Sequence, residues 1–226
     1  DRMNGDCFEL LKSLPIKPTL VLSDPPYLHN KGGGKTEGTE GKSKIANSPM
    51  YQFGSFMMSE MSSFGEEKVR ALLDACNNIQ EKMNGYFFCN DTLIPFYTMW
   101  AVENNKKYTI LVWKKPTAIM NRNRYAQDIE YIVRVYDNGT ALNQLELTEE
   151  TKPYYSKVQV IQPPKKKNHP TEKPVALLER IVLLNTREGD WVLDPFMGGG
   201  STGHASLKHN RGFIGLEINK EHFASA

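Results

Sequence analysis

Residues 191–201 read WVLDPFMGGGS, an apolar run that meets a glycine-rich turn. We predict a buried strand at 191–193 and a helix at 201–209, with the glycines between them. Glycines in such a turn let the backbone pass close to a ligand, and the helix that they open presents amide groups to an anionic group. The stretch therefore indicates α/β architecture and a nucleotide-like ligand, with a purely structural turn as the alternative.

The next apolar run, 213–216, is predicted to be a second strand that ends at Glu217. A carboxylate at that place can accept hydrogen bonds from both hydroxyls of a ribose, which argues for a cofactor that carries adenosine. No P-loop lysine follows the glycines, so the sequence argues against triphosphate hydrolysis.

Outward from this unit, strands and helices alternate along the chain. Further strands are predicted at 18–23, 85–90, 108–113 and 129–136, and further helices at 66–84, 92–104 and 174–185, with Gly85 ending the first helix. This alternation is typical of a mostly parallel sheet with helices on both faces. A length of 226 residues favours one domain that spans 1–226.

Asp24, Pro25, Pro26 and Tyr27 directly follow the apolar run 18–23. Prolines cannot continue a strand ladder, so Asp24 is placed at the carboxyl end of a strand. The Asp24 carboxylate and the Pro25 carbonyl are two acceptors that can hold one aromatic amino group and return its lone pair to nitrogen for attack on an electrophilic methyl group. Tyr27 can stack on a base. The alternative is a proline turn that only caps the strand.

Three motifs in one order carry a family resemblance: Asp24 to Tyr27, then HPTEKP at 169–174, then DPF with its glycines at 194–200. Together they resemble the amino-group DNA methyltransferases of the circularly permuted β class, over essentially the whole chain. The resemblance implies a Rossmann-like S-adenosylmethionine (SAM) methyltransferase fold with permuted motif order. It also implies methyl transfer from SAM to N6 of adenine in DNA, on a base flipped out of the duplex.

The resemblance also implies roles for individual residues. Four residues would form the catalytic motif that holds and stacks the target base: Asp24, Pro25, Pro26 and Tyr27. The residues expected to bind the cofactor are Asp6, Cys7, Asp24, Thr171, Lys173, Asp194, Phe196, Gly198, Gly200, Ser201 and Glu217. Among these, Glu217 would hold the ribose, and Lys173 with Thr171 would lie near the cofactor's carboxylate.

Two segments lie outside the predicted strands and helices. Residues 28–64 include KGGGKTEGTEGKSK at 31–44 and are predicted to form a mobile loop that closes over DNA, with plain disorder as the alternative. Residues 137–167 stand where the target-recognition region is expected and begin with acids. Recognition of the DNA sequence is therefore assigned to the long loop, to a partner subunit or to segments beyond this chain. The two ends of the chain are expected to be edges of a longer protein.

Charge and cysteine content restrict the partners. The net charge is +2, but no acid stands between Glu103 and Asp128, a stretch that holds these bases: Lys106, Lys107, Lys114, Lys115, Arg122 and Arg124. They either contact DNA phosphates or form a solvated face. Three dispersed cysteines predict neither a disulfide nor a metal site, and no apolar run is long enough for a membrane. A cytoplasmic protein is expected.

Several alternatives stay open. N4 methylation of cytosine needs the same hold on an amine, although Asp24 stands where the cytosine enzymes usually have serine. RNA offers the same chemistry on a single-stranded base, and a catalytically silent SAM-fold subunit is the alternative from another class. Carbon-5 methylation is not expected, because no cysteine follows a proline. A homodimer, a partner subunit and a restriction-modification role are all compatible with the sequence.

Overall fold

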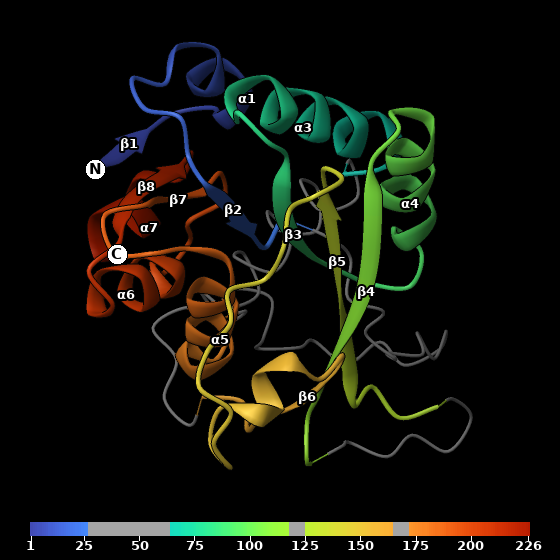
Figure 1. Ribbon diagram of the computed structural model, residues 1–226. Coiled ribbons are helices and arrows are strands. Elements are labelled where there is room, and N and C mark those ends of the chain that lie inside the picture. Colours follow the sequence, from blue (N-terminus) through green and yellow to red (C-terminus); the bar gives the residue numbers. More distant parts are fainter. Residues whose placement is uncertain (27–63, 118–124, 165–171) are drawn as a thin grey trace, which may run out of the picture.

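The computed structural model describes residues 1–26, 64–117, 125–164 and 172–226. Within these residues, eight strands form one sheet in the order β1-β8-β7-β2-β3-β5-β4-β6 (Figure 1). The strands are β1 (Arg2–Asn4), β2 (Leu20–Ser23), β3 (Asn84–Cys89), β4 (Lys107–Lys114), β5 (Ile129–Tyr136), β6 (Val158–Val160), β7 (Trp191–Asp194) and β8 (Gly212–Glu217). The helices are α1 (Cys7–Leu10), α3 (Glu66–Ile79), α4 (Ile94–Glu103), α5 (Val175–Asn185), α6 (Ser201–Lys208) and α7 (Lys220–Ser225), with 3-10 turns η1 (Leu11–Ser13) and η2 (Lys152–Tyr155).

The sheet is mostly parallel, because only β5 runs antiparallel to its neighbours β3 and β4. Helices cover both faces. Successive strand residues point to opposite faces, and in β3 the Phe87 ring stacks on Tyr97 of α4, whereas the next residue, Phe88, lies under the Lys173 ammonium just before α5. The predicted α/β, Rossmann-like fold class is confirmed.

Helix α3 differs from its predicted extent. Its buried stripe of Val69, Leu72, Leu73 and Cys76 has the expected helical spacing. The helix nevertheless ends at Ile79, because the Gln80 side chain bonds both the N–H and the carbonyl of Asn84 and closes a turn there. The prediction that Gly85 ends this helix is wrong.

Gly85 lies instead inside β3, where its lack of a side chain has a packing reason. A Cβ atom at Gly85 would stand 2.6 Å from the ring of Phe87. That ring is fully buried between this glycine and the stacked Tyr97 ring, with centroids 5.3 Å apart, and has no free space to move into. Glycine is therefore required at this position by the neighbouring ring.

The segment 137–167 was predicted to be irregular, and that prediction is wrong in part. Val158–Val160 forms the edge strand β6, which pairs in parallel with β4, and Lys152–Tyr155 forms η2. The residues described by the structure therefore extend the sheet by one strand on the side away from β7. The predicted loop 28–64 lies outside the described residues except for Phe64, which is buried in the core.

The strand order fixes where a ligand can bind. Chain connections run from β2 outward to β3 and from β7 outward to β8 on the other side, so adjacent strands β2 and β7 form the switch point of the sheet. Ligands of open α/β sheets bind in the crevice beyond the carboxyl ends of the strands at such a point. Asp24 and Asp194 both stand there. No helix among the described residues is long and apolar enough to cross a membrane.

Candidate active site

Asp194, the last residue of β7, connects the glycine turn to the neighbouring strand. Its Oδ1 accepts hydrogen bonds from the Phe196 N–H at 3.1 Å and from the Ser23 hydroxyl of β2 at 3.2 Å. Burial raises the pKa of Asp194 to about 7, although a hydrogen bond from Thr202 opposes the rise. The carboxyl group thus fixes the start of the turn against β2.

The glycine turn has a backbone that favours glycine. Gly198 and Gly200 have φ angles of 51° and 80°, in the left-handed region that side chains rarely adopt. Among the described residues there is open space around Gly198, since an added Cβ would meet only the Phe196 carbonyl oxygen there, 3.9 Å away. Gly200 is the N-cap of α6, and half-buried Ser201 is its first residue. The turn can therefore bring backbone N–H groups close to a ligand.

Glu217, at the end of β8, binds the same turn from the other side. Its Oε2 accepts from the Gly198 N–H at 2.9 Å, and its Oε1 accepts from the Asn219 N–H at 2.8 Å. A carboxylate has about four acceptor sites, so each oxygen can accept a further hydrogen bond, as two ribose hydroxyls require. The residue expected to hold the ribose thus also supports the glycine turn.

The amino-terminal segment lies beside Glu217. Strand β1 pairs with β8, and the Gly5 N–H donates to the Glu217 carbonyl oxygen at 3.0 Å. Asp6 then caps α1 by accepting from the Phe8 N–H at 2.9 Å. Cys7 is buried, and this burial raises the pKa of its thiol to about 12. The structure therefore places Asp6 and Cys7 just after β1, the strand that pairs with β8 and so lies beside Glu217.

Asp24 directly follows β2 and pairs with a lysine. Its Oδ2 accepts from the Lys173 ammonium at 2.5 Å. Its Oδ1 is buried and has no hydrogen-bond partner among the described residues. Burial raises the pKa of Asp24 to about 6, while Lys173 lowers it and Glu130 raises it. Pro25 is buried beside it, and Pro26 is half-buried.

Lys173 contacts protein carboxylates in this structure. Its Nζ lies 2.5 Å from Asp24 Oδ2 and 3.3 Å from Glu130 Oε2. The sequence placed Lys173 near the cofactor's carboxylate and missed Glu130 altogether. A single acid at the start of the otherwise largely apolar strand 129–136 was the available signal, but only the antiparallel direction of β5 brings it to the carboxyl edge of β3.

The remaining predicted site residues divide into two groups. Phe196 is half-buried in the crevice and meets Phe64 edge-on, with ring centroids 5.6 Å apart. Tyr27 and Thr171 lie outside the described residues, as does the histidine at 169. Asp24, Asp194, Gly198 and Glu217 come together at the carboxyl ends of β2, β7 and β8, as the motif order predicts.

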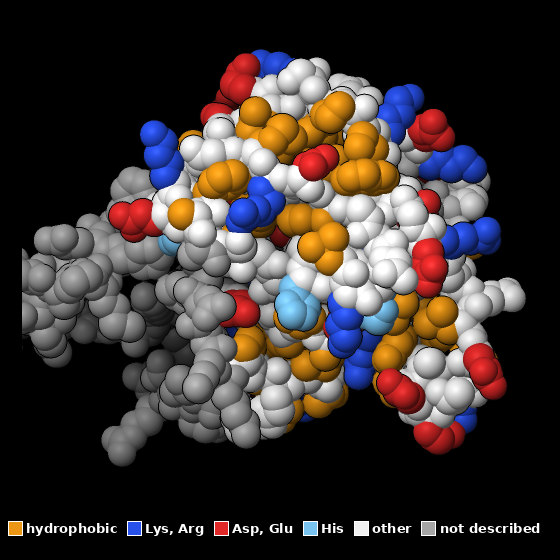
Figure 2. All heavy atoms as spheres, turned by 90° about the vertical axis from the view of Figure 1, so that its left-hand side faces the viewer, with side chains coloured by type: hydrophobic (Ala, Val, Ile, Leu, Met, Phe, Trp, Pro, Cys, Tyr) orange, Lys and Arg blue, Asp and Glu red, His pale blue; other side chains and the backbone are white. Residues whose placement is uncertain are grey.

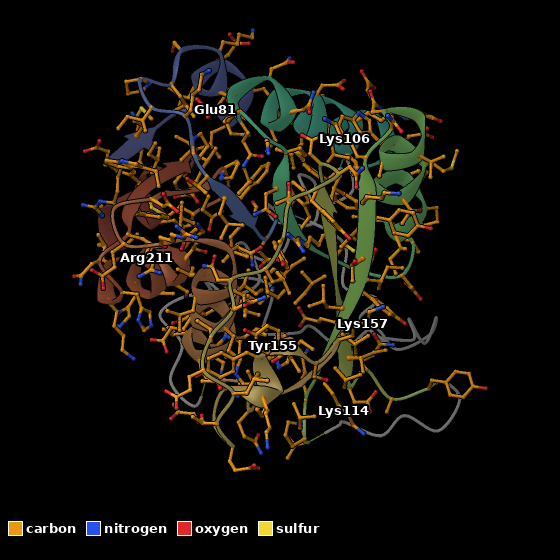
Figure 3. The ribbon with its side chains drawn as sticks, in the orientation of Figure 1. Glu81, Lys106, Lys114, Tyr155, Lys157 and Arg211 are labelled. Carbon is orange, nitrogen blue, oxygen red and sulfur yellow. The ribbon has the colours of Figure 1, made fainter. Side chains whose placement is uncertain are left out.

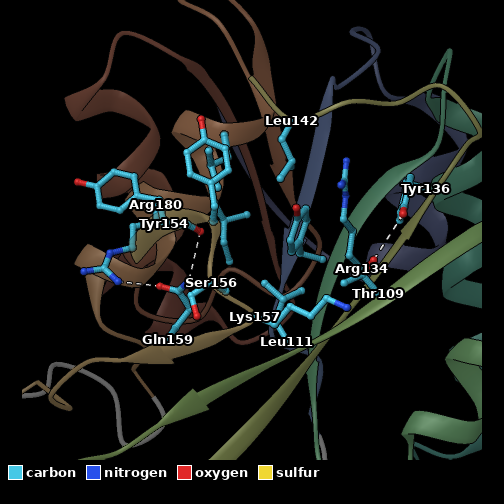
Figure 4. Close-up of a pocket in the computed structure, with 14 residues that line it drawn as sticks. Thr109, Leu111, Arg134, Tyr136, Leu142, Tyr154, Ser156, Lys157, Gln159 and Arg180 are labelled. Carbon is cyan, nitrogen blue, oxygen red and sulfur yellow. Dashed lines mark hydrogen bonds between the residues drawn. The ribbon is translucent and has the colours of Figure 1, made fainter. Parts of the chain in front are cut away.

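Away from this crevice, a cavity of about 260 Å³ lies between the sheet and the segment around η2 (Figure 4). Arg134 on its wall is buried, stacks on Tyr136 at 4.0 Å and donates to Asn84. Arg180 donates to Gln159 at 2.7 Å. None of the predicted site residues that the structure describes lines this cavity, and these internal contacts account for its two arginines.

The basic stretch between Glu103 and Asp128 does not form one patch in its described part. Figure 3 places Lys106 and Lys114 at opposite ends of β4. Lys106 forms an ion pair with Asp137 at 2.8 Å, and Lys115 forms one with Glu130 at 2.6 Å. Both lysines therefore already have a carboxylate partner within the protein. On the face formed by the chain ends and α6, charges of both signs are interspersed (Figure 2). Contact of this stretch with DNA phosphates stays a prediction, and its residues 118–124 lie outside the described residues.

Across residues 1–26, 64–117, 125–164 and 172–226, no group of three His, Cys, Asp or Glu side chains is placed to hold a metal ion. That the protein uses no metal stays a prediction.

Comparisons with known proteins agree on one family. The profile of the N6/N4 methyltransferase family, described as DNA methylase, matches residues 19–226. The chain is 27% identical over 240 residues to the type II methyltransferase M2.DpnII of Streptococcus pneumoniae, covering 99% of this chain and 87% of that protein. A 55-residue match to the DNA adenine methyltransferase YhdJ of Escherichia coli K12 is 54% identical and covers 24% of this chain and 19% of that protein. The crystal structure of an M1.HpyAVI–SAM complex superimposes with a TM-score of 0.68 at 26% identity, over 100% of this chain and 97% of that one.

Proposed function

The chain belongs to the N6/N4 DNA methylase family, and from that premise we propose that it transfers a methyl group from SAM to N6 of adenine in DNA. The observation that carries this proposal is the Oδ1 atom of Asp24. It is a buried acceptor without a partner among the described residues, at the switch point of the sheet and next to the glycine turn. A buried acceptor normally has a hydrogen-bond donor, and an exocyclic amino group supplies one.

The cofactor is SAM, which supplies the methyl group when bound. Gly198 with the open space around it, Glu217 with its unused acceptor sites, and Asp6 and Cys7 beyond β1 are the residues that fit it. Phe196, Gly200 and Ser201 complete the turn around its methionine part. Thr171 belongs to the proposed set through the sequence motif.

The residues of the crevice act on the substrate by holding and orienting it. Asp24 Oδ1 and the Pro25 carbonyl accept the two amine protons, and Tyr27 stacks on a base that has left the duplex. The amine nitrogen would bond to the methyl carbon in line as the carbon–sulfur bond breaks, so that S-adenosylhomocysteine leaves, and the nitrogen would then lose one proton to water. No covalent intermediate with the protein is needed, since orientation and charge stabilisation are sufficient.

Adenine is favoured over cytosine by two observations. Asp24 opens the motif, where cytosine-N4 enzymes usually carry serine, and the relative YhdJ is named a DNA adenine methyltransferase. Cytosine N4 is the second candidate, because the family includes both specificities. Carbon-5 methylation is disfavoured because Cys7, Cys76 and Cys89 are buried, and burial raises the pKa of each thiol.

The decisive experiment identifies the methylated product. The protein is incubated with methyl-labelled SAM and unmodified duplex DNA or RNA, the nucleic acid is digested to nucleosides, and the label is located by mass spectrometry. Label in N6-methyladenine from DNA is the expected result. Label in N4-methylcytosine would move the target base, label only in RNA would move the substrate, and SAM binding without any transfer would support a catalytically silent subunit.

A further inference from the structure

Four charged side chains, Asp24 and three behind it, alternate in sign along a chain of contacts. Lys173 Nζ lies 2.5 Å from Asp24 Oδ2 and 3.3 Å from Glu130 Oε2, and Glu130 Oε1 lies 2.6 Å from Lys115 Nζ. The chain of contacts draws on three parts of the fold: the end of β2, the segment two residues before α5, and the neighbouring ends of β4 and β5, where β4 stops and β5 starts. It therefore depends on tertiary structure and on no sequence motif alone.

These charges are removed from water. The side chains of Lys173 and Glu130 are 6% and 11% exposed, and that of Asp24 is 21% exposed. Ionised groups in such surroundings are strongly destabilising unless an opposite charge accompanies them. Although burial lowers it, the pKa of Lys173 is raised overall, because Asp24 and Glu130 both stabilise the ammonium. The lysine thus stays charged between two carboxylates.

We propose that Lys173 and Glu130 are positioning residues for methyl transfer: Lys173 binds Oδ2 of Asp24 so that the carboxylate stays ionised with Oδ1 directed to the target amine, and Glu130 holds the Lys173 ammonium there. This inference rests on the proposed function. It also gives Lys173 a contact other than the cofactor's carboxylate.

The charge state of Asp24 decides its role as an acceptor. An ionised carboxylate only accepts hydrogen bonds, whereas a protonated one can also donate. Burial alone favours the protonated form, and Lys173 opposes this by lowering the pKa of Asp24. Glu130 acts in the opposite direction, because its negative charge raises the same pKa. Removing the charge of Lys173 and removing that of Glu130 should therefore shift the pH profile of methyl transfer in opposite directions.

Other titratable side chains also lie near Asp24. Lys115 from β4 lowers the pKa of Asp24. Asp194 at the end of β7, Cys89 of β3 and Tyr97 of α4 each experience the Asp24 charge. Burial raises the pKa of Cys89 and of Tyr97, so both are neutral near pH 7. Asp194 has a pKa of about 7 and is the group whose titration must be separated from that of Asp24.

The test measures kcat/KM for methyl transfer to duplex DNA against pH. Lys173→Met removes the opposite charge, so the acidic limb should move to higher pH by about 1–3 units. Glu130→Gln keeps the shape and removes the like charge, so the limb should move to lower pH. Lys173→Arg retains the charge and should leave the limb near that of the wild type. Lys106→Met breaks the remote Lys106–Asp137 pair and serves as the matched control, with no shift expected.

A second readout does not depend on catalysis. In ¹³C NMR of aspartate-labelled protein, the carboxyl resonance that disappears in Asp24→Asn is assigned to Asp24, and its titration is followed in each variant. Spectra of Asp194→Asn identify the other carboxyl group. Opposite shifts for Lys173→Met and Glu130→Gln are expected here too, and Glu130→Gln alone carries the sign test if the lysine variant does not fold.

The outcomes separate this inference from the proposed function. If the wild type methylates DNA but Glu130→Gln and Lys173→Met keep its pH profile, the positioning roles are overturned and the proposed function stands. If the wild type transfers no methyl group, the proposed function fails. Titration shifts of opposite sign in that case would still support the control of Asp24 by its two neighbours. Equal shifts in the Lys106→Met control would assign the effect to general destabilisation and overturn the inference.

Discussion

At the scale of single residues, the two carboxylate oxygens of Asp24 differ: one has a hydrogen-bond donor, and the other is buried without one in the described part of the chain. Lys173 occupies Oδ2, and Oδ1 has no partner among the described residues. An acceptor fixed in this way needs no reorganisation when the substrate amine arrives, which is the condition under which a polar group contributes most to a transition state.

Asp24→Ala should retain SAM binding and lose methyl transfer by about 100-fold or more, the range for removing one preorganised polar group. Lys173 keeps Glu130 as a counter-charge in this variant, so the fold should persist. SAM binding is measured by calorimetry and transfer by single-turnover assays. Turnover near that of the wild type would contradict the role assigned to Asp24.

Asp194 gives a prediction for stability against pH. Its pKa is raised from 3.8 to about 7, chiefly by burial. A raised pKa means that the folded state binds the proton more tightly, so this contribution to stability is complete below the unfolded value and is lost as pH rises through about 7. Asp194→Asn keeps an acceptor oxygen for Phe196 and removes the titration. The difference in unfolding free energy, wild type minus variant, should fall with rising pH across that window.

The expected slope is at most about 1.4 kcal/mol per pH unit, the value for one proton. Urea unfolding of both proteins at several pH values measures it, and Asp24 titrates in both, so its contribution largely cancels. A difference that stays flat or increases with pH would show that Asp194 is not protonated more readily in the folded state.

At the scale of elements, Gly85 shows how a neighbour's ring selects a residue. Gly85→Ala places a methyl group 2.6 Å from the buried Phe87 ring, which is stacked on Tyr97. Overpacking of this kind destabilises by about 1–3 kcal/mol. Gly65→Ala is the control, since an added Cβ there meets no atom of the described residues within 4 Å, and a change below about 1 kcal/mol is expected at that N-cap. Equal urea midpoints for the two variants would refute this packing argument.

Long elements with a clear pattern could be predicted from sequence. Residues 129–136 form a strand with the predicted bounds, and the buried stripe of α3 has the predicted spacing. The three-residue strands at the two edges of the sheet could not. β1 has three residues and is held by pairing with β8 at the other end of the chain, and β6 exists because it pairs with β4. Neither strand has a local pattern strong enough to identify it.

Some residues of the candidate site could likewise be predicted from sequence, and others could not. Asp24, Asp194 and Glu217 were predictable, because each ends a strand and parallel strands end at one edge of a sheet. Glu130 was not, because its place depends on the antiparallel direction of β5. The contact of Lys173 with Asp24 joins residues 149 positions apart, and no spacing in the sequence encodes it.

At the scale of the whole molecule, the two ends of the chain build one side of the crevice. β1 pairs with β8, and the chain ends lie near each other in Figure 1. The Arg2 side chain donates a hydrogen bond to the Ala226 carbonyl oxygen. The proposed cofactor residues Asp6, Gly198 and Glu217 thus come from segments far apart in sequence that are joined by β8. A ligand that contacts all three holds the two ends together.

This arrangement predicts a marked stabilisation by SAM. A ligand at about 100 times its Kd adds about 2.7 kcal/mol to the free energy of unfolding. For a domain of this size that corresponds to a rise in Tm of about 5–10 °C. Glu217→Ala should lower the Tm of the ligand-free protein, because the Gly198 and Asn219 N–H groups lose their acceptor, and should also abolish most of the rise with SAM.

Exposed Glu188 on the turn before β7 provides the matched control, because Glu188→Ala removes an acid of the same kind from solvent. Its Tm and its rise with SAM should equal those of the wild type in thermal unfolding scans. If Glu217→Ala retains the full rise, the ribose contact must be assigned to another residue, and the carboxylate of Glu217 would serve only to join the glycine turn to β8. If Glu217→Ala lowers the Tm of the ligand-free protein and also loses the rise with SAM, one carboxylate both supports the glycine turn and binds the cofactor, which is the arrangement that the two hydrogen bonds of Glu217 imply.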